Sequence, residues 1–174
     1  MAKMERQKKK RERTSQTLFQ EARDIALVYL SRRARSAHEV VRRLKQKKFS
    51  EEIIAEVLSE LERLRFVDDY AYARRWIEAR VDKAASAYKL TQDLRRKGIA
   101  GDVIDELLSE YSVQLENPDR AVQLLRKQAW RYRSLERKKA QRRMLGLLAR
   151  RGYDGRTAWE SVEHVWKEIE EDEV

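Results

Sequence analysis

Hydrophobic residues recur along this chain at spacings of three and four positions, which is the period of an amphipathic helix. The first stripe, formed by Ala22, Ile25, Ala26 and Tyr29, predicts a helix over about residues 17–33. Further stripes follow along the whole chain, and no segment has the two-residue alternation typical of a strand. The pattern therefore predicts an all-α fold of about nine helices.

Polar residues in front of several stripes suit helix starts, and two glycines suit helix ends. Ser36 with Glu39 three positions later forms a capping box, in which each side chain bonds a backbone N–H of the first turn. Simple caps are predicted at Ser50, Asp68, Ser86 and Ser134. Gly98 and Gly152 are expected at left-handed corners, because glycine has no Cβ to clash there.

The chain also repeats itself at an offset of 50 residues without a gap. The stretch from Ser36 to Leu44 lies over the stretch from Ser86 to Leu94, and the hydrophobic positions stay in register up to Tyr111. A fainter third copy follows at an offset of 54, where Gly98 falls on Gly152. Tandem units of this kind stack into arrays whose long surfaces usually bind other macromolecules.

We therefore expect an elongated array of three tandem three-helix repeats. The predicted parts are a basic N-terminal tail over 1–16, repeat 1 over 17–66, repeat 2 over 67–112, and a linker with repeat 3 and an acidic C-terminal end over 113–174. Pro118, the single proline, is placed in the first turn of a helix that follows a linker over 112–117. The tail is expected either as a frayed leader or as an arm that touches phosphates.

The charge of the chain is large and unevenly placed. Charged residues make up 40% of the sequence, and the formal net charge is +10. Residues 120–151 carry twelve Lys and Arg against one Glu, whereas residues 160–174 carry seven acidic residues against one Lys. A local positive field of this kind favours a polyanion or an acidic protein surface as partner.

Several classes of protein are disfavoured. Cysteine is absent, so disulfides and thiol chemistry are excluded. No apolar stretch approaches the roughly 20 residues of a membrane span, and the basic N-terminus lacks the apolar core of a secretory signal. We expect a cytoplasmic protein without a membrane association.

No catalytic or metal-binding set is predicted. His38 and His164 are the only histidines and lie in different repeats, and neither has a second histidine or a thiol nearby in the sequence. Asp68 and Asp69 are adjacent carboxylates, but neighbours on a helix do not face each other and Asp68 suits a cap. No glycine-rich phosphate loop occurs. We expect no enzyme activity, no cofactor and no metal.

The basic stretch is the main candidate binding site. A plain solvated face would mix both signs of charge, so the excess of cations predicts a binding role. Trp130 and Tyr132 are interleaved with the cations and either stack on bases or turn into the core. The candidate binding residues are Arg95, Arg96, Lys97, Arg126, Lys127, Arg131, Arg133, Arg137, Lys138, Lys139, Arg142 and Arg143.

Several motifs together resemble the RecX family of bacterial regulators of the recombinase RecA. The stretch from Arg35 to Leu44 is similar to the family's Arg-Ser-x-x-Glu-Leu-x-x-x-Leu motif, and the stretch from Phe66 to Trp76 is similar to its Asp-Asp-x-x-x-Ala-x-x-aromatic motif. Gly98 and Gly152 stand in similar basic-Gly-apolar corners. The residues that carry this signature are Ser36, Glu39, Asp68, Asp69, Ala73, Trp76, Gly98 and Gly152.

Three positions depart from the family pattern. Lys48 replaces a corner glycine, Arg65 stands where a glycine often precedes the Asp-Asp motif, and the segment from Asp82 to Lys89 lacks the usual glycine. The resemblance implies a non-enzymatic negative regulator that binds RecA and the RecA–DNA filament. It also implies reduced ATP hydrolysis, strand exchange and coprotease activity of RecA.

Two other functions compete with this interpretation. Three-helix repeats also suit a sequence-nonspecific DNA-binding protein, although no helix groups Asn, Gln and Arg for reading base edges. A nucleic-acid-processing enzyme is a distant third. Direct contact with DNA remains open, and a monomer is expected because an array can bind lengthwise.

Overall fold

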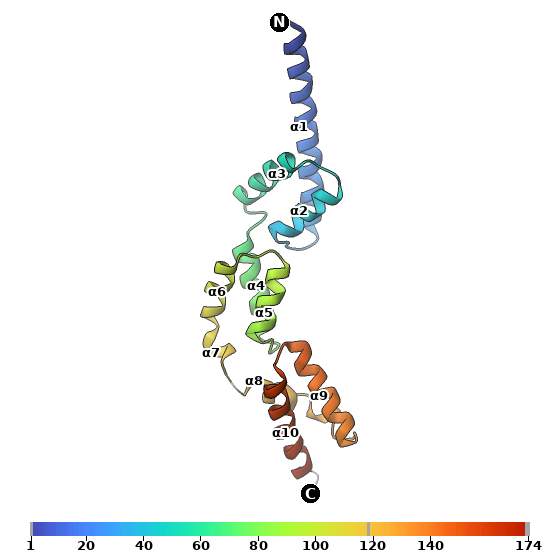
Figure 1. The fold of residues 1–174 in the computed structure, drawn as a ribbon, viewed down its shortest axis with the longest axis vertical. Coiled ribbons are helices and arrows are strands. Elements are labelled where there is room, and N and C mark those ends of the chain that lie inside the picture. Colours follow the sequence, from blue (N-terminus) through green and yellow to red (C-terminus); the bar gives the residue numbers. More distant parts are fainter. Residues whose placement is uncertain (1, 118, 173–174) are drawn as a thin grey trace. The chain divides into compact units, whose positions relative to one another are not determined.

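The computed structural model describes the backbone of residues 2–117 and 119–172 and the side chains of residues 14–117 and 119–172. Every regular element in this part of the chain is a helix, which confirms the all-α prediction (Figure 1). None of the described helices is both long and apolar enough to cross a membrane. The elements are α1 (Ala2–Ser31), α2 (Ala37–Gln46), α3 (Glu51–Arg63), α4 (Asp69–Val81), α5 (Ala87–Arg96), α6 (Gly101–Glu110), α7 (Ser112–Leu115), α8 (Arg120–Arg126), the 3-10 helix η1 (Ala129–Arg131), α9 (Arg137–Arg151) and α10 (Gly155–Glu171).

The chain divides into two compact units. The first unit extends to Ala73 and also includes Arg96–Ala100, whereas the second unit holds Arg74–Arg95 and the chain from Gly101 onward. The division falls inside the predicted second repeat. The corner after α5 belongs to the first unit because it packs on the start of α2 through the contacts described below.

In the first unit, α1, α2 and α3 pack against one another around a core of alanine and branched aliphatic side chains. All of them except Val67 lie on α1, α2 and α3 at helical spacings, so the helical period correctly predicted which faces of these helices are buried. Burial of this apolar area is the main stabilising contribution to the unit. The buried residues are Ala22, Ala26, Val40, Leu44, Ile53, Ile54, Val57, Leu61 and Val67.

In the second unit, α10 packs against both α8 and α9. Their core combines aliphatic residues with two larger aromatic side chains. It contains Ala121, Leu125, Tyr132, Ala140, Met144, Leu148, Ala158, Val162, Val165, Trp166 and Ile169. In the middle of the chain, α4, α5 and α6 bury Ile77, Leu90, Leu94, Ile104 and Leu107 completely.

Three local expectations differ from the structure. Helix α1 begins at Ala2 rather than near residue 17, and the side chains of residues 1–13 lie outside the described part. The segment expected as a linker, residues 112–117, contains the short helix α7, so the described chain has ten α-helices rather than nine. Ser134 is not a cap, since α9 begins at Arg137 after Glu136. Tight turns, closed by backbone bonds such as Leu135 N–H to Tyr132 O, delay its start.

The two predicted corner glycines both lie against the start of a helix from the preceding repeat. In the first unit, the Ser36 hydroxyl donates to the Lys97 carbonyl at 2.6 Å, and a Cβ on Gly98 would lie 2.4 Å from the His38 Cβ. The φ angle of Gly98 is +77°. Only a residue without a side chain fits this conformation and this close approach.

The second unit repeats the arrangement at the equivalent residues. The Ser86 hydroxyl donates to the Gly152 carbonyl at 2.8 Å, and the Ser86 N–H donates to the Arg151 carbonyl at 2.9 Å. Gly152 has φ +84°, and a Cβ there would lie 2.5 Å from the Lys89 Cβ. A cap serine therefore has two functions, because it starts its own helix and also binds the corner of the next repeat.

The three departures from the family's glycines are the three described non-glycine residues with positive φ. Lys48 has φ 65°, Arg65 has φ 58°, and Ala84 has φ 55°. A left-handed backbone costs a residue with a Cβ about 1–2 kcal/mol. The chain therefore adopts a left-handed backbone at these corners at a cost in stability.

We predict that Gly98→Ala destabilises the protein by at least about 2 kcal/mol, because the new methyl group meets His38 in a left-handed backbone. Gly101→Ala is the control, since a Cβ at the start of α6 has nothing within 4 Å. We expect this control to be neutral or stabilising by less than about 1 kcal/mol. Urea unfolding followed by circular dichroism measures both, and equal stabilities would contradict the prediction.

We predict that Lys48→Gly stabilises the protein by about 0.5–1 kcal/mol, because glycine removes the left-handed strain at the corner after α2. Lys47→Gly removes the same charge one residue earlier, where φ is −86°. The free energy of unfolding of that control should fall by about 0.5–1 kcal/mol, because glycine adds backbone entropy to the unfolded chain. Thermal unfolding of the pair gives the sign of each change.

Candidate functional site

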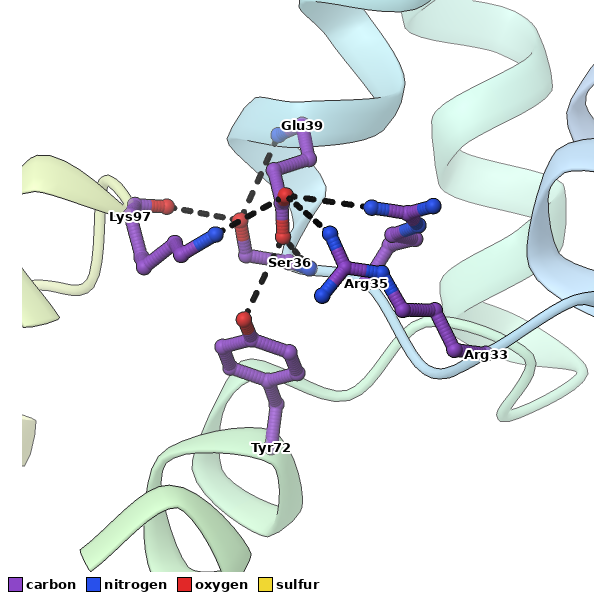
Figure 2. A network of polar contacts seen from close by, with 6 residues as sticks. All are labelled: Arg33, Arg35, Ser36, Glu39, Tyr72 and Lys97. Carbon is purple, nitrogen blue, oxygen red and sulfur yellow. Dashed lines mark hydrogen bonds and ion pairs between the residues drawn. The ribbon is translucent and has the colours of Figure 1, made fainter.

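The signature residues Ser36 and Glu39 lie in a buried polar network with Tyr72 and Lys97 (Figure 2). The predicted capping box is confirmed, since the Glu39 N–H donates to Ser36 Oγ at 3.3 Å and the Ser36 N–H to Glu39 Oε2 at 3.4 Å. The Tyr72 hydroxyl donates to Oε2 at 3.2 Å, and Lys97 Nζ donates to Oε1 at 3.0 Å. One carboxylate thus joins α2, α4 and the corner after α5.

Two arginines complete the network around the same carboxylate. Arg35 and Arg33 approach Glu39 Oε1 at 3.5 and 3.7 Å. Burial raises the pKa of Glu39, but the hydrogen bond from Lys97, the Ser36 N–H, the Lys97 charge and the Tyr72 hydroxyl lower it further than burial raises it. The net pKa lies below the ordinary value of 4.5, so the carboxylate is ionised at neutral pH.

The Asp-Asp motif also serves the fold. Asp68 Oδ1 accepts the Ala71 N–H at 2.8 Å, which confirms Asp68 as the cap of α4. Asp69 Oδ1 accepts the N–H of Ala37, the first residue of α2, at 2.8 Å. Burial raises the pKa of Asp69, and the Ala37 N–H opposes that rise only in part. The two carboxylates therefore act on different helices and do not converge on one point.

The predicted binding residues near the corner after α5 divide in two. Arg95 and Arg96 are exposed at the end of α5. Lys97 is half-buried, and its ammonium group is held by Glu39. Lys97, which was predicted to contact a partner, thus contributes to the fold. The sequence could not show this contact, because the repeat pattern does not indicate which distant carboxylate faces the lysine.

Acidic residues on α10 and at its C-terminal cap, Asp172, neutralise three of the predicted binding arginines. Arg126 forms a two-pronged ion pair with Glu168, with Nε 2.9 Å from Oε2, and hydrogen bonding to Glu168 raises the pKa of Arg126. Arg133 pairs with Asp172 at 2.7 Å. Arg137 pairs with α10 too, at Glu163 and Glu170, 3.2 and 3.5 Å away. The acidic end therefore covers one side of the basic segment.

The other cations of this segment remain exposed. Within the described residues, no carboxylate lies within ion-pair distance of Lys127, Lys138, Lys139, Arg142 or Arg143. Arg142 and Arg143 line a groove of about 600 Å³ together with Arg131 and Arg150. Its other lining residues are Gln128, Tyr132, Gly146 and Leu147, so no acidic residue is among them. The groove is an anion-binding candidate.

The two aromatic residues of the basic segment have different surroundings. Tyr132 is 5% exposed and belongs to the core of the second unit, whereas Trp130 is 74% exposed. Burial raises the pKa of Tyr132, and the positive charges of Arg131, Arg150 and Arg143 partly oppose that rise. Tyr132 therefore turns into the core, whereas Trp130 stays in solvent, where stacking on a base remains a prediction.

One lining residue of this surface was not predicted from the sequence. Gly146 lines the groove together with Arg150, which belongs to the basic stretch singled out in the sequence. Gly146 follows Arg142 on α9 at a spacing of four, and this helical spacing is the signal that could have found it. Among the described side chains, no group of three or more His, Asp or Glu is arranged to hold a metal ion.

The fold and these motifs define a class of protein, the all-helical repeat proteins built from three-helix units. Comparison with family models is consistent with this class. A model described as "RecX, first three-helix domain" matches residues 22–61, and one described as "RecX, second three-helix domain" matches residues 68–108. The first match covers α2 and α3 with the end of α1, and the second covers α4 to α6.

Curated relatives extend the match over most of the chain. Regulatory protein RecX of Streptomyces coelicolor is 32% identical over 88% of this chain and 81% of its own length. Regulatory protein RecX of Clostridium acetobutylicum is 33% identical over 85% of this chain and 68% of its own. The chain belongs to the RecX family of regulatory proteins.

Solved structures agree at the level of the fold. A crystal structure of a regulatory protein RecX aligns with a TM-score of 0.67 at 24% identity, over 91% of this chain and 77% of that one. The crystal structure of RecX from Lactobacillus salivarius aligns with a TM-score of 0.62 at 22% identity, over 87% of this chain and 96% of that one.

We predict that Glu39→Gln lowers the free energy of unfolding by about 2 kcal/mol at pH 7, because it leaves Lys97 and the two arginines around a neutral group. A lowered pKa means that this contribution is present above 4.5 and is lost as the pH falls through the lower folded value. The difference from the wild type should therefore shrink in acid. Urea unfolding at pH 7 and near pH 3.5 measures this.

Glu56→Gln is the matched control, because Glu56 is an exposed carboxylate on α3. Its effect should be small at both pH values. A loss for Glu39→Gln that does not change with pH would contradict an ionised Glu39 as the source of the stabilisation. Asp69 has a raised pKa and contributes with the opposite sign; the Glu39 charge is a minor cause of that rise, so Glu39→Gln relieves a small part of it and offsets a small part of the loss at pH 7.

Proposed function

We propose that this protein is a non-enzymatic negative regulator of the RecA recombinase. It binds RecA and the RecA–DNA filament and inhibits ATP hydrolysis, strand exchange and coprotease activity. The observation that carries the proposal is membership of the RecX family over most of the chain. The exposed cations of α8 and α9 supply a physical means of binding a filament that carries nucleic acid.

The proposed contact surface is the basic segment from Arg126 to Arg143, with Arg95 and Arg96 assisting; Lys97, also predicted from the sequence, is held by Glu39 instead. Arg126, Arg133 and Arg137 are held by α10, so they contribute mainly by shaping this surface. Lys127, Lys138, Lys139, Arg142 and Arg143 carry uncompensated charge and would make the contacts. Such exposed charges act chiefly on the association rate and on its salt dependence.

A sequence-nonspecific DNA-binding protein is the second candidate. The arginine-lined groove on α9 favours it, because guanidinium groups bind phosphate oxygens with two parallel hydrogen bonds. The two functions differ in stoichiometry. A filament regulator acts when it is far scarcer than RecA, whereas a DNA-coating protein acts only when it covers the DNA.

We predict inhibition of RecA ATP hydrolysis on single-stranded DNA at concentrations of this protein well below that of RecA. A coupled assay that follows ADP release, titrated with this protein, measures it. Inhibition that begins only when there is enough protein to coat the DNA would refute the regulator and support the second candidate.

Reversal of charge tests the contact surface. Lys127→Glu, Lys138→Glu and Lys139→Glu together should weaken inhibition at least tenfold, because binding loses attraction and gains repulsion. Arg42→Glu, Lys47→Glu and Lys48→Glu make the same change in net charge at exposed residues of the first unit and should leave more inhibition intact. Circular dichroism should show unchanged helicity for both variants. Full inhibition by the first variant would refute the proposed surface.

A further inference from the structure

We propose that the groove of α9 is a binding site for single-stranded nucleic acid, with phosphates at Arg131, Arg142, Arg143 and Arg150 and a base stacked on Trp130. The site works on the protein alone, without RecA, so it goes beyond the proposed inhibition of the filament. Three features of the second unit support this site: the shape of the groove, the charges that line it and the exposed indole beside it.

The groove has the size and the chemistry of a ligand site. Its volume of about 600 Å³ falls within the range of about 300–1,000 Å³ found for clefts that bind small organic groups. Four arginines line it and no carboxylate does. Planar guanidinium groups suit phosphate oxygens, which they bind through paired hydrogen bonds.

The acidic residues at the C-terminal end pair with arginines outside the groove and not with those that line it. Glu163, Glu168 and Asp172 engage Arg137, Arg126 and Arg133 respectively. The described structure shows none of these carboxylates on the groove arginines, so the groove keeps its positive charge. The acidic C-terminal end therefore neutralises three arginines of the basic segment and leaves the groove arginines to bind an anion.

The ligand extends along the helix. Arg143 and Arg150 are seven residues apart on α9, which corresponds to two turns or about 10 Å along the axis. Gly146 lies between them and also lines the groove, so no side chain there divides it. Successive phosphates of a nucleic-acid strand match such a row of cations better than a single phosphate does.

Trp130 distinguishes a nucleic acid from an acidic peptide. Its side chain is 74% exposed, in contrast to the buried Trp166 and Tyr132 of the same unit. The Arg131 guanidinium lies 5.8 Å from the centroid of the Trp130 ring and also lines the groove, so the indole stands beside the phosphate-binding residues. An exposed aromatic ring beside a cationic groove is the arrangement by which single strands are bound, through base stacking.

The first experiment measures the affinity of the protein for fluorescently labelled oligothymidylate by anisotropy, without RecA, over a range of salt concentrations. We expect the logarithm of affinity to fall with the logarithm of salt by about 0.7 for each phosphate contact. Arg131→Gln, Arg142→Gln and Arg143→Gln together should weaken binding at least about tenfold and reduce that slope. The matched control, Arg42→Gln with Lys47→Gln and Lys48→Gln, removes the same charge from the first unit. Equal losses in both variants would overturn the site.

Two single substitutions and a matched control test the site without removing a cation. Gly146→Glu places a carboxylate in the groove and should abolish binding. The control, Gly155→Glu, adds the same charge at the start of α10, where a Cβ has nothing within 4 Å, and should retain much more binding. Trp130→Ala should weaken binding of the single strand about tenfold, with little effect on duplex DNA of the same length. Similar binding of single strand and duplex, both insensitive to Trp130, would overturn the proposed single-strand site.

Poly-glutamate tests an acidic protein segment as the alternative ligand. Efficient competition by poly-glutamate at equal charge, with no sensitivity to Trp130→Ala, would overturn the assignment to nucleic acid. These outcomes are independent of RecA. Failure of the groove to bind oligothymidylate leaves substoichiometric inhibition of RecA by the wild type as a separate test of the proposed function.

Discussion

The carboxylate of Glu39 is the interaction on which the first unit depends. A buried charge is costly unless it is paired and hydrogen-bonded. Here the cost is offset by the ammonium of Lys97, two arginines, the Tyr72 hydroxyl and a backbone N–H. Because these groups come from α2, α4 and the corner after α5, the charge can be satisfied only when all three segments are in place. The network therefore selects one arrangement of the segments rather than merely adding to their stability.

A contact between a cap serine and the glycine corner of the next repeat occurs in both units. Ser36 binds the Lys97 carbonyl in the first unit, and Ser86 binds the Gly152 carbonyl in the second. Both corners need a left-handed residue without a side chain. At the second contact, however, Lys89 occupies the position equivalent to Glu39 and pairs with Asp93 on its own helix. The serine and the glycine thus recur, whereas the buried carboxylate belongs to the first contact alone.

In the second unit, some arginines form ion pairs with acidic residues and others line the groove without a carboxylate among its lining residues. Arg126, Arg133 and Arg137 form ion pairs with acidic residues of the C-terminal end, and exposed pairs of this kind add little to the free energy of unfolding. Their larger effect is on the distribution of charge. The acidic C-terminal end pairs with three arginines, and the arginines of the groove keep their positive charge beside the exposed indole of Trp130. This division is consistent with a regulator that binds other macromolecules.

The sequence by itself determined the helices and the faces that they bury. Helical periodicity requires no knowledge of distant residues, so the stripes through Leu44, Leu61 and Leu148 were correctly predicted as core. Local rules were equally sufficient for the capping box at Ser36 and the left-handed Gly98 and Gly152, since both depend on neighbours in the chain. They failed at Ser134, where turns after η1 delay the start of α9.

Only the tertiary structure decided which charged side chains form ion pairs within the protein. Lys97 faces Glu39 across 58 positions and Arg126 faces Glu168 across 42, and no local pattern encodes such pairings. The same physical reason explains why two aromatic residues two positions apart, Trp130 and Tyr132, could not be assigned from sequence to solvent and to core.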